Sequence, residues 1–476
     1  MELIKEDEGL EPVSPTGQYF NSKVMSVSIL GILESEIPID DSLAQLLIRD
    51  VFLPINPRFS SIMVMRQNGA RKWKKVEVNV ENHVHVPSFS SPKGSSSPSP
   101  SENDSFLKSY ISQIAMRPFP QGQPLWEIHI IKCPTSEAQG TVIFKLHHAL
   151  GDGYSLVGAL LSCLQRADDP SLPITFPSVN NFSSANKDDR NIGLRKVVSR
   201  CFLPLVDTVR DFSWSVLKST CVKDDLSPIW RGSENFRPFS VSTITFSLDR
   251  IKEIKSRLRV TVNDVIVGVV FLATRLYMHR TRGKSNLGTN STALVLLNTR
   301  NLRDYKSVSD MVRPNSKSPW GNNFAFLHVP IPKVKPSDSQ FSDPVKFVHK
   351  AHEVIKRKRS SLGVVLTGKL LEIMKKCRNA EAVAKHISRT LRNSSMVISN
   401  VMGPMEKLSL ANHPVKGMYY TVVGTPESLR ITIFSYAGNL RVAVGAEEGF
   451  VDSELYTSSL LDAFNAILDD ACRKQQ

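Results

Sequence analysis

Short apolar runs recur along the whole chain, and most of them have the length and the β-branched or aromatic content of β-strands. Polar segments rich in Gly, Pro, Ser and Asn separate them and favour turns. In the first half of the chain the predicted strands are residues 27–30, 61–65, 76–80, 126–131 and 141–146. In the second half they are residues 243–246, 293–297, 323–329, 396–398, 430–434 and 440–444. Helical segments alternate with these strands, so the pattern predicts an α/β protein with mixed sheets.

Three longer segments predict helices of different kinds. Residues 154–164 are almost wholly apolar and follow a strand and a Gly-rich turn, which indicates a buried helix. Residues 265–278 are apolar on nearly all sides but fall short of the about 20 residues that cross a bilayer, so a core helix is favoured over a membrane span. Residues 347–359 mix apolar with basic side chains, which predicts a helix with an exposed basic face.

Residues 195–222 form a fourth helical segment whose apolar side chains recur every three or four positions. Asp207, Arg210 and Asp211 lie near its middle, and each would cost about 2.5 to 3.5 kcal/mol at a bilayer centre, which argues against a span. Two alternatives stay open: the helix lies in a membrane interface, or it docks between two domains. The apolar positions are Phe202, Leu205, Val206, Val209, Phe212 and Val216.

The length of 476 residues exceeds the roughly 250 to 300 at which one hydrophobic core stops growing, so we expect two domains. Residues 87–105 are so rich in Ser and Pro that they predict a mobile loop inside the first domain. A polar, Pro-bearing connector at residues 168–190 marks the break. The predicted division is 1–190 for an N-terminal domain, 191–235 for a linker with the amphipathic helix, and 236–476 for a C-terminal domain.

Composition narrows the class of protein. Hydrophobic residues make up 41% and charged residues 22%, as in ordinary globular proteins, which argues against extensive disorder. The net charge of +15 favours anionic partners such as nucleic acid, anionic lipid or a phosphate-bearing ligand. The six cysteines include no C-x-x-C pair and are expected to be free thiols, and the acidic N-terminal segment resembles no secretory signal peptide.

The most informative residues for chemistry are His147 and His148, at the end of the predicted strand 141–146. The turn Gly151-Asp152-Gly153 follows, and its glycines allow close backbone approach. An imidazole there can accept a proton near neutral pH, and Asp152 can brace the turn. Because paired histidines also occur by chance, a purely structural role is the competing interpretation at this point.

The residues around His147 and His148 resemble a motif of a known protein family. The segment HHALGDG satisfies H-H-x-x-x-D-G, the motif of the coenzyme-A-dependent acyltransferases that include chloramphenicol acetyltransferase and peptide-synthetase condensation domains. Pro124-Leu125-Trp126 is similar to a P-L-W element, Asn263-Asp264 opens the apolar helix of the second half, and residues 399–404 resemble an N-V-x-G-P element. Together these resemble the plant branch of the bifunctional wax ester synthase/acyl-CoA:diacylglycerol acyltransferase family over nearly the whole chain.

The resemblance implies two α/β domains like chloramphenicol acetyltransferase, with the active site at their interface and a tunnel reaching it from both sides. It implies that His148 takes the hydroxyl proton of a fatty alcohol or diacylglycerol while the oxygen attacks an acyl-CoA thioester, without a covalent intermediate. His147 would orient or pack, and Asp152 would be mainly structural, with Arg300 and Arg441 as candidate partners. Asn263 is expected either to stabilise an oxyanion or to cap its helix, and the expected substrate-binding residues are Gly153, Trp126 and Asn400.

The resemblance also suggests partners and a location. Acyl-CoA is expected as a co-substrate, with no other cofactor and no metal, and the positive charge would attract its phosphates and an anionic membrane surface. We find no zinc-finger, P-loop or nucleic-acid-binding motif, so no nucleic acid is expected. The implied location is the endoplasmic reticulum membrane on its cytosolic face, with the plasma membrane as a second site.

Two alternatives remain at this stage. The chain could be a non-catalytic scaffold of the same fold that binds acyl-CoA or lipid, although the intact His148, Asp152 and Gly153 disfavour that. The plant acyltransferases that modify soluble phenolics share H-x-x-x-D, but their D-F-G-W-G motif is absent here.

Overall fold

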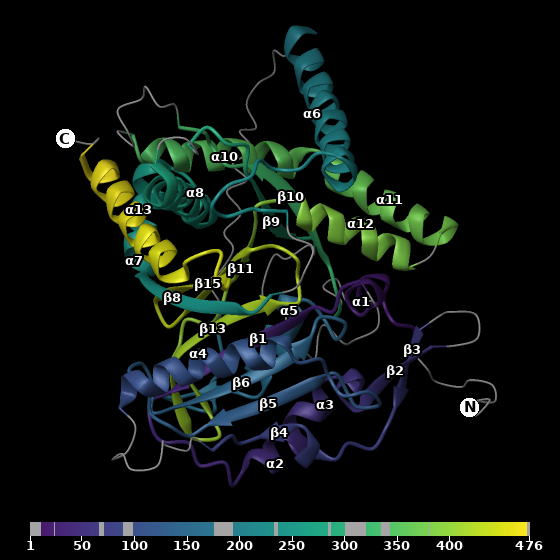
Figure 1. Cartoon of the computed structure of the whole chain (residues 1–476), viewed down its shortest axis with the longest axis vertical. Helices are drawn as coiled ribbons and strands as arrows, with labels where there is room; N and C mark the ends of the chain where they lie inside the picture. Colours follow the sequence, from purple (N-terminus) through teal and green to yellow (C-terminus); the bar gives the residue numbers. More distant parts are fainter. Residues whose placement is uncertain are drawn as a thin grey trace.

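A computed structural model of the chain shows two large β-sheets with helices packed around them (Figure 1). The structure describes residues 11–22, 24–65, 71–88, 99–175, 194–232, 237–283, 287–299, 320–334, 343–378 and 380–473.

The first sheet has seven strands in the order β4-β5-β6-β1-β13-β12-β7. All neighbours are antiparallel except β4 and β5. Its central strands are buried along their whole length because helices or the second sheet cover both faces. The strands are β1 (Ser28–Ser35), β4 (Val84–His85), β5 (Trp126–Ile131), β6 (Gly140–His147), β7 (Gln165–Arg166), β12 (Leu408–Leu410) and β13 (His413–Val423).

The second sheet has six strands in the order β10-β9-β11-β14-β15-β8 and is mixed, since β11 runs parallel to both of its neighbours. One large apolar core joins it to the helices α7, α8, α10 and α13. The strands are β8 (Phe239–Ser247), β9 (Thr292–Asn298), β10 (Phe324–Pro330), β11 (Met396–Val401), β14 (Leu429–Tyr436) and β15 (Asn439–Glu447). The helices are α7 (Leu248–Leu258), α8 (Val262–Arg282), α10 (Val345–Ser360) and α13 (Ser453–Arg473).

Smaller elements complete the first half. They include a two-stranded sheet, β2 (Ser61–Met65) and β3 (Arg71–Lys75), and the helices α4 (Pro100–Met116) and α5 (Gly153–Ser162). Short helical turns are α1 (Pro15–Phe20), α2 (Ala44–Leu47), η1 (Ile48–Phe52), α3 (Leu53–Ile55), η2 (Pro57–Ser60) and η3 (Val80–Asn82).

Strand β13 connects the two halves of the molecule. It pairs with β1 in the first sheet, and the chain then turns directly into β14 of the second sheet. Glu34 of β1 accepts a hydrogen bond from Arg441 of β15 at 2.8 Å, which joins the sheets a second time. The sheets therefore share chain segments, and residues 408–423 belong to the sheet built mainly from the N-terminal half. The division at residues 190 and 235 stays a prediction.

Helix α6 (Leu194–Thr220) confirms the predicted helix but turns its polar side inward. Thr208, Ser215, Lys218 and Ser219 are buried, whereas Val206, Val209, Trp214 and Leu217 are exposed. Hydrogen bonds attach the polar side to the neighbouring helices α11 (Gly363–Cys377) and α12 (Ala380–Arg392). These polar contacts all attach α6 to helices of the second half of the chain, whereas the prediction was docking between two domains. They leave an apolar stripe facing solvent.

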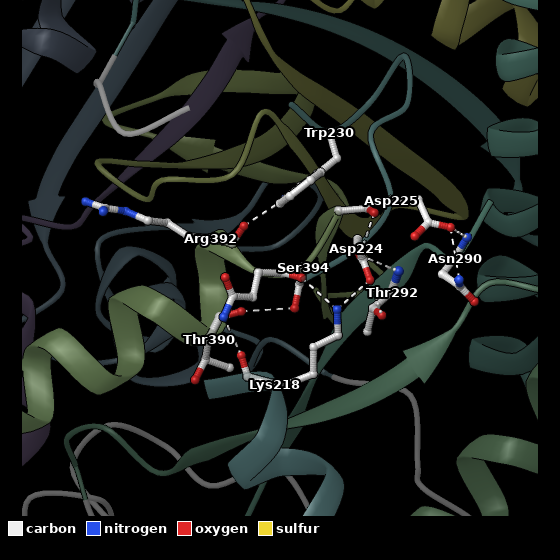
Figure 2. A network of polar contacts seen from close by, with 11 residues as sticks. Lys218, Asp224, Asp225, Trp230, Asn290, Thr292, Thr390, Arg392 and Ser394 are labelled. Carbon is white, nitrogen blue, oxygen red and sulfur yellow. Dashed lines mark hydrogen bonds and ion pairs between the residues drawn. The ribbon is translucent and has the colours of Figure 1, made fainter. Parts of the chain in front are cut away.

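A buried polar network holds the end of α6 (Figure 2). Lys218, with a side chain 1% exposed, donates to Asp224 and to the Asn393 carbonyl. Asp224 also accepts hydrogen bonds from the Thr292 amide and hydroxyl and from the Ser395 hydroxyl. One carboxylate therefore ties α6 to both β9 and the start of β11.

Two predictions about the first half are corrected by the structure. Residues 76–80 form no strand, because the Asn79 side chain accepts from the Glu81 amide and starts a helical turn instead. The predicted mobile loop 87–105 ends earlier, because α4 begins at Pro100 with a capping box between Ser99 and Glu102. Residues 89–98 lie outside the described part of the chain.

Helix α8 is the one described helix long and apolar enough to cross a membrane, judged by length and composition. Of its most apolar 18-residue window, 78% is buried in the fold, so it is a core helix as predicted. No described cysteine forms a disulfide; Cys133, Cys163, Cys221, Cys377 and Cys472 are free thiols.

Candidate active site

A cavity of about 250 Å³ lies between the two sheets. Its walls come from β1 and β13 on one side and from β9, β10, β11 and β14 on the other, and the start of α5 closes part of it. Most lining side chains are apolar or aromatic, as in a site for an apolar substrate. The polar lining residues are His148, Asp152, Asn298, Asn323, Ser399, Asn400, Thr425, Glu427, Arg430 and Thr432.

The segment HHALGDG forms the turn between β6 and α5, as the sequence predicted. Asp152 caps α5, because its Oδ1 accepts a hydrogen bond from the Ser155 amide at 3.0 Å. A side chain at Gly151 would place its Cβ only 2.9 Å from the Cβ of Ser155, so the turn needs glycine there. Gly153 begins the helix and lines the cavity, and its contact to substrate stays a prediction.

His148 lines the cavity, and its ring is held by Asn322. The Asn322 amide nitrogen donates to the His148 carbonyl at 2.9 Å, and the His148 Nδ1 lies 2.8 Å from the Asn322 Oδ1. Because that amide oxygen can only accept, Nδ1 must carry the proton, which leaves the lone pair on Nε2. No described residue makes a hydrogen bond to Nε2. His148 is therefore in the tautomer that a general base requires.

Two aromatic rings fix the plane of the His148 imidazole. The Phe20 ring centroid lies 4.7 Å from it, and that of Phe324 lies 5.5 Å away. Burial is the largest influence on the ring and lowers the pKa of His148, while the Asp152 carboxylate acts in the opposite direction. The ring is therefore neutral at physiological pH and able to accept a proton.

His147 was predicted as a catalytic neighbour, but it does not line the cavity. Its Nδ1 accepts from the Ala149 amide at 3.0 Å, and its Nε2 lies 3.2 Å from the Ser26 hydroxyl. Burial lowers the pKa of His147 to about 3. Both ring nitrogens are thus used by the protein, which gives His147 a bracing role beside His148.

Asp152 lines the cavity and contacts a segment that the sequence did not single out, Trp320-Gly321-Asn322-Asn323. Its Oδ2 accepts from the Asn323 amide at 2.8 Å, and its own amide donates to the Gly321 carbonyl. The Trp320 indole donates to the Leu150 carbonyl at 2.8 Å. This segment therefore holds the HHALGDG turn from the opposite half of the molecule.

The candidate arginines for Asp152 have different outcomes. Arg441 pairs with Glu34 at 2.8 Å, so it is occupied elsewhere. Arg300 lies outside the described residues.

Asn263 and Asn400 lie together near the cavity. The predicted cap by Asn263 is wrong: Thr261 caps α8, and Asp264 completes a capping box with it. Asn400, at the end of β11, lines the cavity and donates from Nδ2 to the Asn263 Oδ1 at 3.3 Å. Asn263 therefore contacts the lining residue Asn400 but does not line the cavity itself.

Trp126 was predicted to bind substrate, but the structure places it in the core of the first half. Its side chain is fully buried, its indole donates to the Phe59 carbonyl at 2.8 Å, and its ring stacks on His83 at 4.2 Å. It lines none of the described cavities near His148. The P-L-W element is thus a packing element.

A metal centre has no candidate ligands in the described part of the chain, where no three His, Cys, Asp or Glu side chains cluster to hold an ion. The expectation that acyl-CoA is needed without a further cofactor stays a prediction.

Comparison with known proteins agrees with this geometry. Residues 53–266 match the wax ester synthase/diacylglycerol acyltransferase catalytic domain, and residues 320–468 match the WS/DGAT C-terminal domain. Wax ester synthase/diacylglycerol acyltransferase 7 of Arabidopsis thaliana is 29% identical over 98% of this chain and 98% of its own length. Wax ester synthase/diacylglycerol acyltransferase 4 of the same plant is 28% identical over 92% of this chain and 86% of its own length.

Solved structures agree on the fold. The wax ester synthase/diacylglycerol acyltransferase from Marinobacter aquaeolei VT8 matches with a TM-score of 0.61 at 17% identity, over 97% of this chain and all of that one. The first condensation domain of the calcium-dependent antibiotic synthetase matches with a TM-score of 0.58 at 12% identity, over 98% and 97% of the two chains. The predicted two-domain α/β architecture is thereby confirmed.

Proposed function

Because this chain belongs to the wax ester synthase/diacylglycerol acyltransferase family and is an acyltransferase, we propose that it moves a fatty acyl group from acyl-CoA to a hydroxyl. The acceptor is a long-chain alcohol or diacylglycerol, and His148 is the general base. The observation that supports this proposal most directly is the tautomer of His148. Its Nε2 carries a lone pair that can accept a proton from a substrate in the mainly apolar cavity. A non-catalytic scaffold would have no need for that arrangement.

The proposed reaction has a simple proton balance. The acceptor oxygen attacks the thioester carbonyl carbon while its proton moves to the Nε2 of His148. The carbon–sulfur bond breaks as the ester forms, and the leaving sulfur of coenzyme A takes the proton from His148. The ring thus returns to its starting state, as a general acid–base catalyst must.

Other residues of the site have supporting roles in this proposal. Asn322 holds the His148 tautomer, and Asp152 fixes the turn through its bonds to Ser155 and Asn323. We assign the predicted polar contact near the reacting carbonyl to Asn400 in preference to Asn263, because only Asn400 lines the cavity. Asn263 orients that amide by accepting one of its protons.

We further propose that α6 and α11 form a surface that docks on anionic lipid, which we call the α6–α11 surface. It consists of the exposed apolar side chains Val206, Val209, Trp214, Leu217, Leu362, Val365, Leu366 and Ile373. The exposed Arg210 and Lys369 lie among them, and the chain carries a net charge of +15. Apolar side chains with basic neighbours suit the head-group region of a bilayer, where the proposed acceptors also partition. A location on the cytosolic face of the endoplasmic reticulum stays part of this proposal.

A single assay tests the proposed activity. Purified full-length protein is supplied with one long-chain acyl-CoA and either hexadecanol or dioleoylglycerol, and free thiol and ester are both measured. We expect equal amounts of thiol and ester with at least one of the two acceptors. Thiol release without ester would indicate a thioesterase, and no release with either acceptor would refute the proposal.

A further inference from the structure

Glu427 is a buried carboxyl group in the cavity wall that the proposed chemistry does not use. It lies in the turn between β13 and β14 and lines the same cavity as His148. Its side chain is 0% exposed, and neither carboxylate oxygen has a hydrogen-bond partner among the described residues. A buried polar group without a partner destabilises a fold, so this one calls for an explanation.

Arg430, the nearest cation, does not satisfy that carboxylate. Its Nε donates to the Thr425 hydroxyl at 2.7 Å, and its Nη2 donates to the carbonyls of Thr425 and Glu427 at 2.6 and 2.9 Å. The Arg430 Nε lies 4.0 Å from the Glu427 Oε2, which is too long for a hydrogen bond. The guanidinium therefore holds the backbone of the turn rather than the carboxylate, and Glu427 remains one of the residues that line the cavity.

The burial of Glu427 also affects the pKa of its carboxyl group. Burial is the largest influence and raises the pKa of Glu427, with smaller opposing effects from Arg430 and Thr425. A carboxyl group accepts hydrogen bonds in either protonation state, and its protonated form also donates one. The Thr425 hydroxyl accepts from Arg430 and lies beside the same carboxyl group. Together these groups present polar side-chain atoms to an oxygen-bearing ligand.

The turn that carries Glu427 is attached to the same segment as His148. Gly424 has φ +84°, and an added Cβ would lie 1.8 Å from the Ser26 carbonyl oxygen, so the turn packs directly on Ser26 and Val27. The Val27 carbonyl accepts the His148 amide at 2.8 Å. The turn of Glu427 and the backbone of His148 are therefore both attached to residues 26–27, so we expect a substrate that reaches His148 to extend along the same wall toward Glu427.

We propose that Glu427 and Thr425 form a subsite for a second oxygen of the acceptor, next to its reacting hydroxyl. This inference rests on the proposed function and specifies its acceptor. Two kinds of acceptor carry an oxygen on the carbon next to the one with the reacting hydroxyl, which we call a vicinal oxygen. It is an ester oxygen in 1,2-diacylglycerol and a hydroxyl in a 1,2-diol. A plain alcohol leaves the carboxyl group unpaired, so Glu427 sets the preference between the two classes of acceptor.

The test compares acceptor preference in purified full-length protein with one acyl-CoA. The acceptors are 1-hexadecanol, 1,2-hexadecanediol, 1,16-hexadecanediol and 1,2-dioleoylglycerol, and kcat/KM is measured for each by thiol release. The variants are Glu427→Met, which removes the polar group at similar volume, and Glu427→Gln, which keeps a donor and an acceptor. Glu448→Met removes an exposed carboxylate on the neighbouring turn and serves as the matched control. Thermal unfolding is recorded for every variant.

We expect Glu427→Met to lower the ratio of vicinal-oxygen acceptors to 1-hexadecanol by about tenfold or more. Glu427→Gln should keep most of that ratio, Glu448→Met should keep all of it, and 1,16-hexadecanediol should behave like 1-hexadecanol. The melting temperature of Glu427→Met should not fall, because the change removes an unpaired buried group. Loss for 1,2-hexadecanediol alone would assign the subsite to a hydroxyl, and loss for dioleoylglycerol alone to an ester.

Two results would overturn the inference. An unchanged ratio in Glu427→Met would mean that the carboxyl group meets only water. An equal loss for all acceptors with a lower melting temperature would mean a structural role. If the unmodified protein releases no thiol with any acceptor, the proposed function itself fails, which separates the two failures.

Discussion

Asn322 and His148 are joined by two hydrogen bonds that run in opposite directions, although 174 positions separate them in the chain. The bond from the Asn322 Nδ2 to the His148 carbonyl fixes the orientation of the amide. The bond between the His148 Nδ1 and the Asn322 Oδ1 keeps the ring proton on Nδ1. A side chain from the second half of the molecule thereby sets the chemistry of a histidine in the first half. In the proposed mechanism, the two sheets must therefore pack correctly before His148 can act as a base.

The pH dependence of activity follows from the surroundings of His148. In the proposed reaction the neutral ring is the active form, so activity should be full above the pKa of His148 and should be lost as the pH falls through it. Burial lowers that pKa from its ordinary 6.5. We therefore expect the acid limb of kcat/KM to have its midpoint below pH 6.5, measured with hexadecanol by thiol release. A midpoint clearly above 6.5 would argue against a buried neutral base.

Replacing Asn322 by Asp should move that acid limb in a known direction. A carboxylate beside Nδ1 favours the protonated imidazole and raises the pKa of His148. The midpoint should therefore shift to higher pH, with lower activity at pH 6. Replacing Asn322 by Leu removes the hydrogen bond without adding charge and should lower kcat while shifting the midpoint less. An identical profile in all three proteins would exclude contact between Asn322 and the base.

The sequence predicted those features of the site that depend on residues close together in the chain, and it missed those that depend on distant partners. The strand 141–146, the buried helix after it and the HHALGDG turn are local patterns, and all three are present. Asn322 gave no local signal, because its role depends on a partner from another part of the chain. Trp126 was assigned to substrate because it belongs to the P-L-W element of the family, but a large indole whose N–H donates to the Phe59 carbonyl is typical of a core.

The strand β13 was missed for a related reason. Pro414, Lys416 and Gly417 interrupt its first half, so it shows no clear alternation of apolar and polar residues. The strand is held by its pairing with β1, a distant segment that the local sequence pattern does not indicate. The inward polar side of α6 was also missed, because apolar periodicity alone does not say which side of a helix the fold buries.

The α6–α11 surface predicts a measurable affinity for membranes. The double variant Val206→Glu and Val209→Glu places two carboxylates on the exposed stripe. It should reduce co-sedimentation with anionic vesicles by about tenfold, since it removes apolar area and adds repulsion. The matched control introduces Ser105→Glu and Ser109→Glu on the exposed side of α4. Equal binding by both double variants would place the membrane contact elsewhere.

The Lys218–Asp224 pair predicts a large effect on stability. Both side chains are nearly inaccessible, so Asp224→Asn would leave a buried ammonium group without its counter-charge. Breaking such a pair from one side costs about 3 to 5 kcal/mol. We expect that loss in the free energy of unfolding by urea. Lys252→Met, which removes an exposed pair with Asp249, should change it by about 1 kcal/mol or less. A similar small effect for Asp224→Asn would show that Lys218 is not held by this pair.

The most direct test of the central claim is the turnover of His148→Ala, with acyl-CoA and the better of the two acceptors. Loss of a positioned general base should lower kcat by about 100- to 10,000-fold. Because the change also removes the ring contacts with Phe20 and Phe324 and the hydrogen bond to Asn322, thermal unfolding is recorded and turnover is compared at a temperature where the variant is folded. Turnover within a few-fold of the unmodified protein in a folded His148→Ala variant would contradict the account.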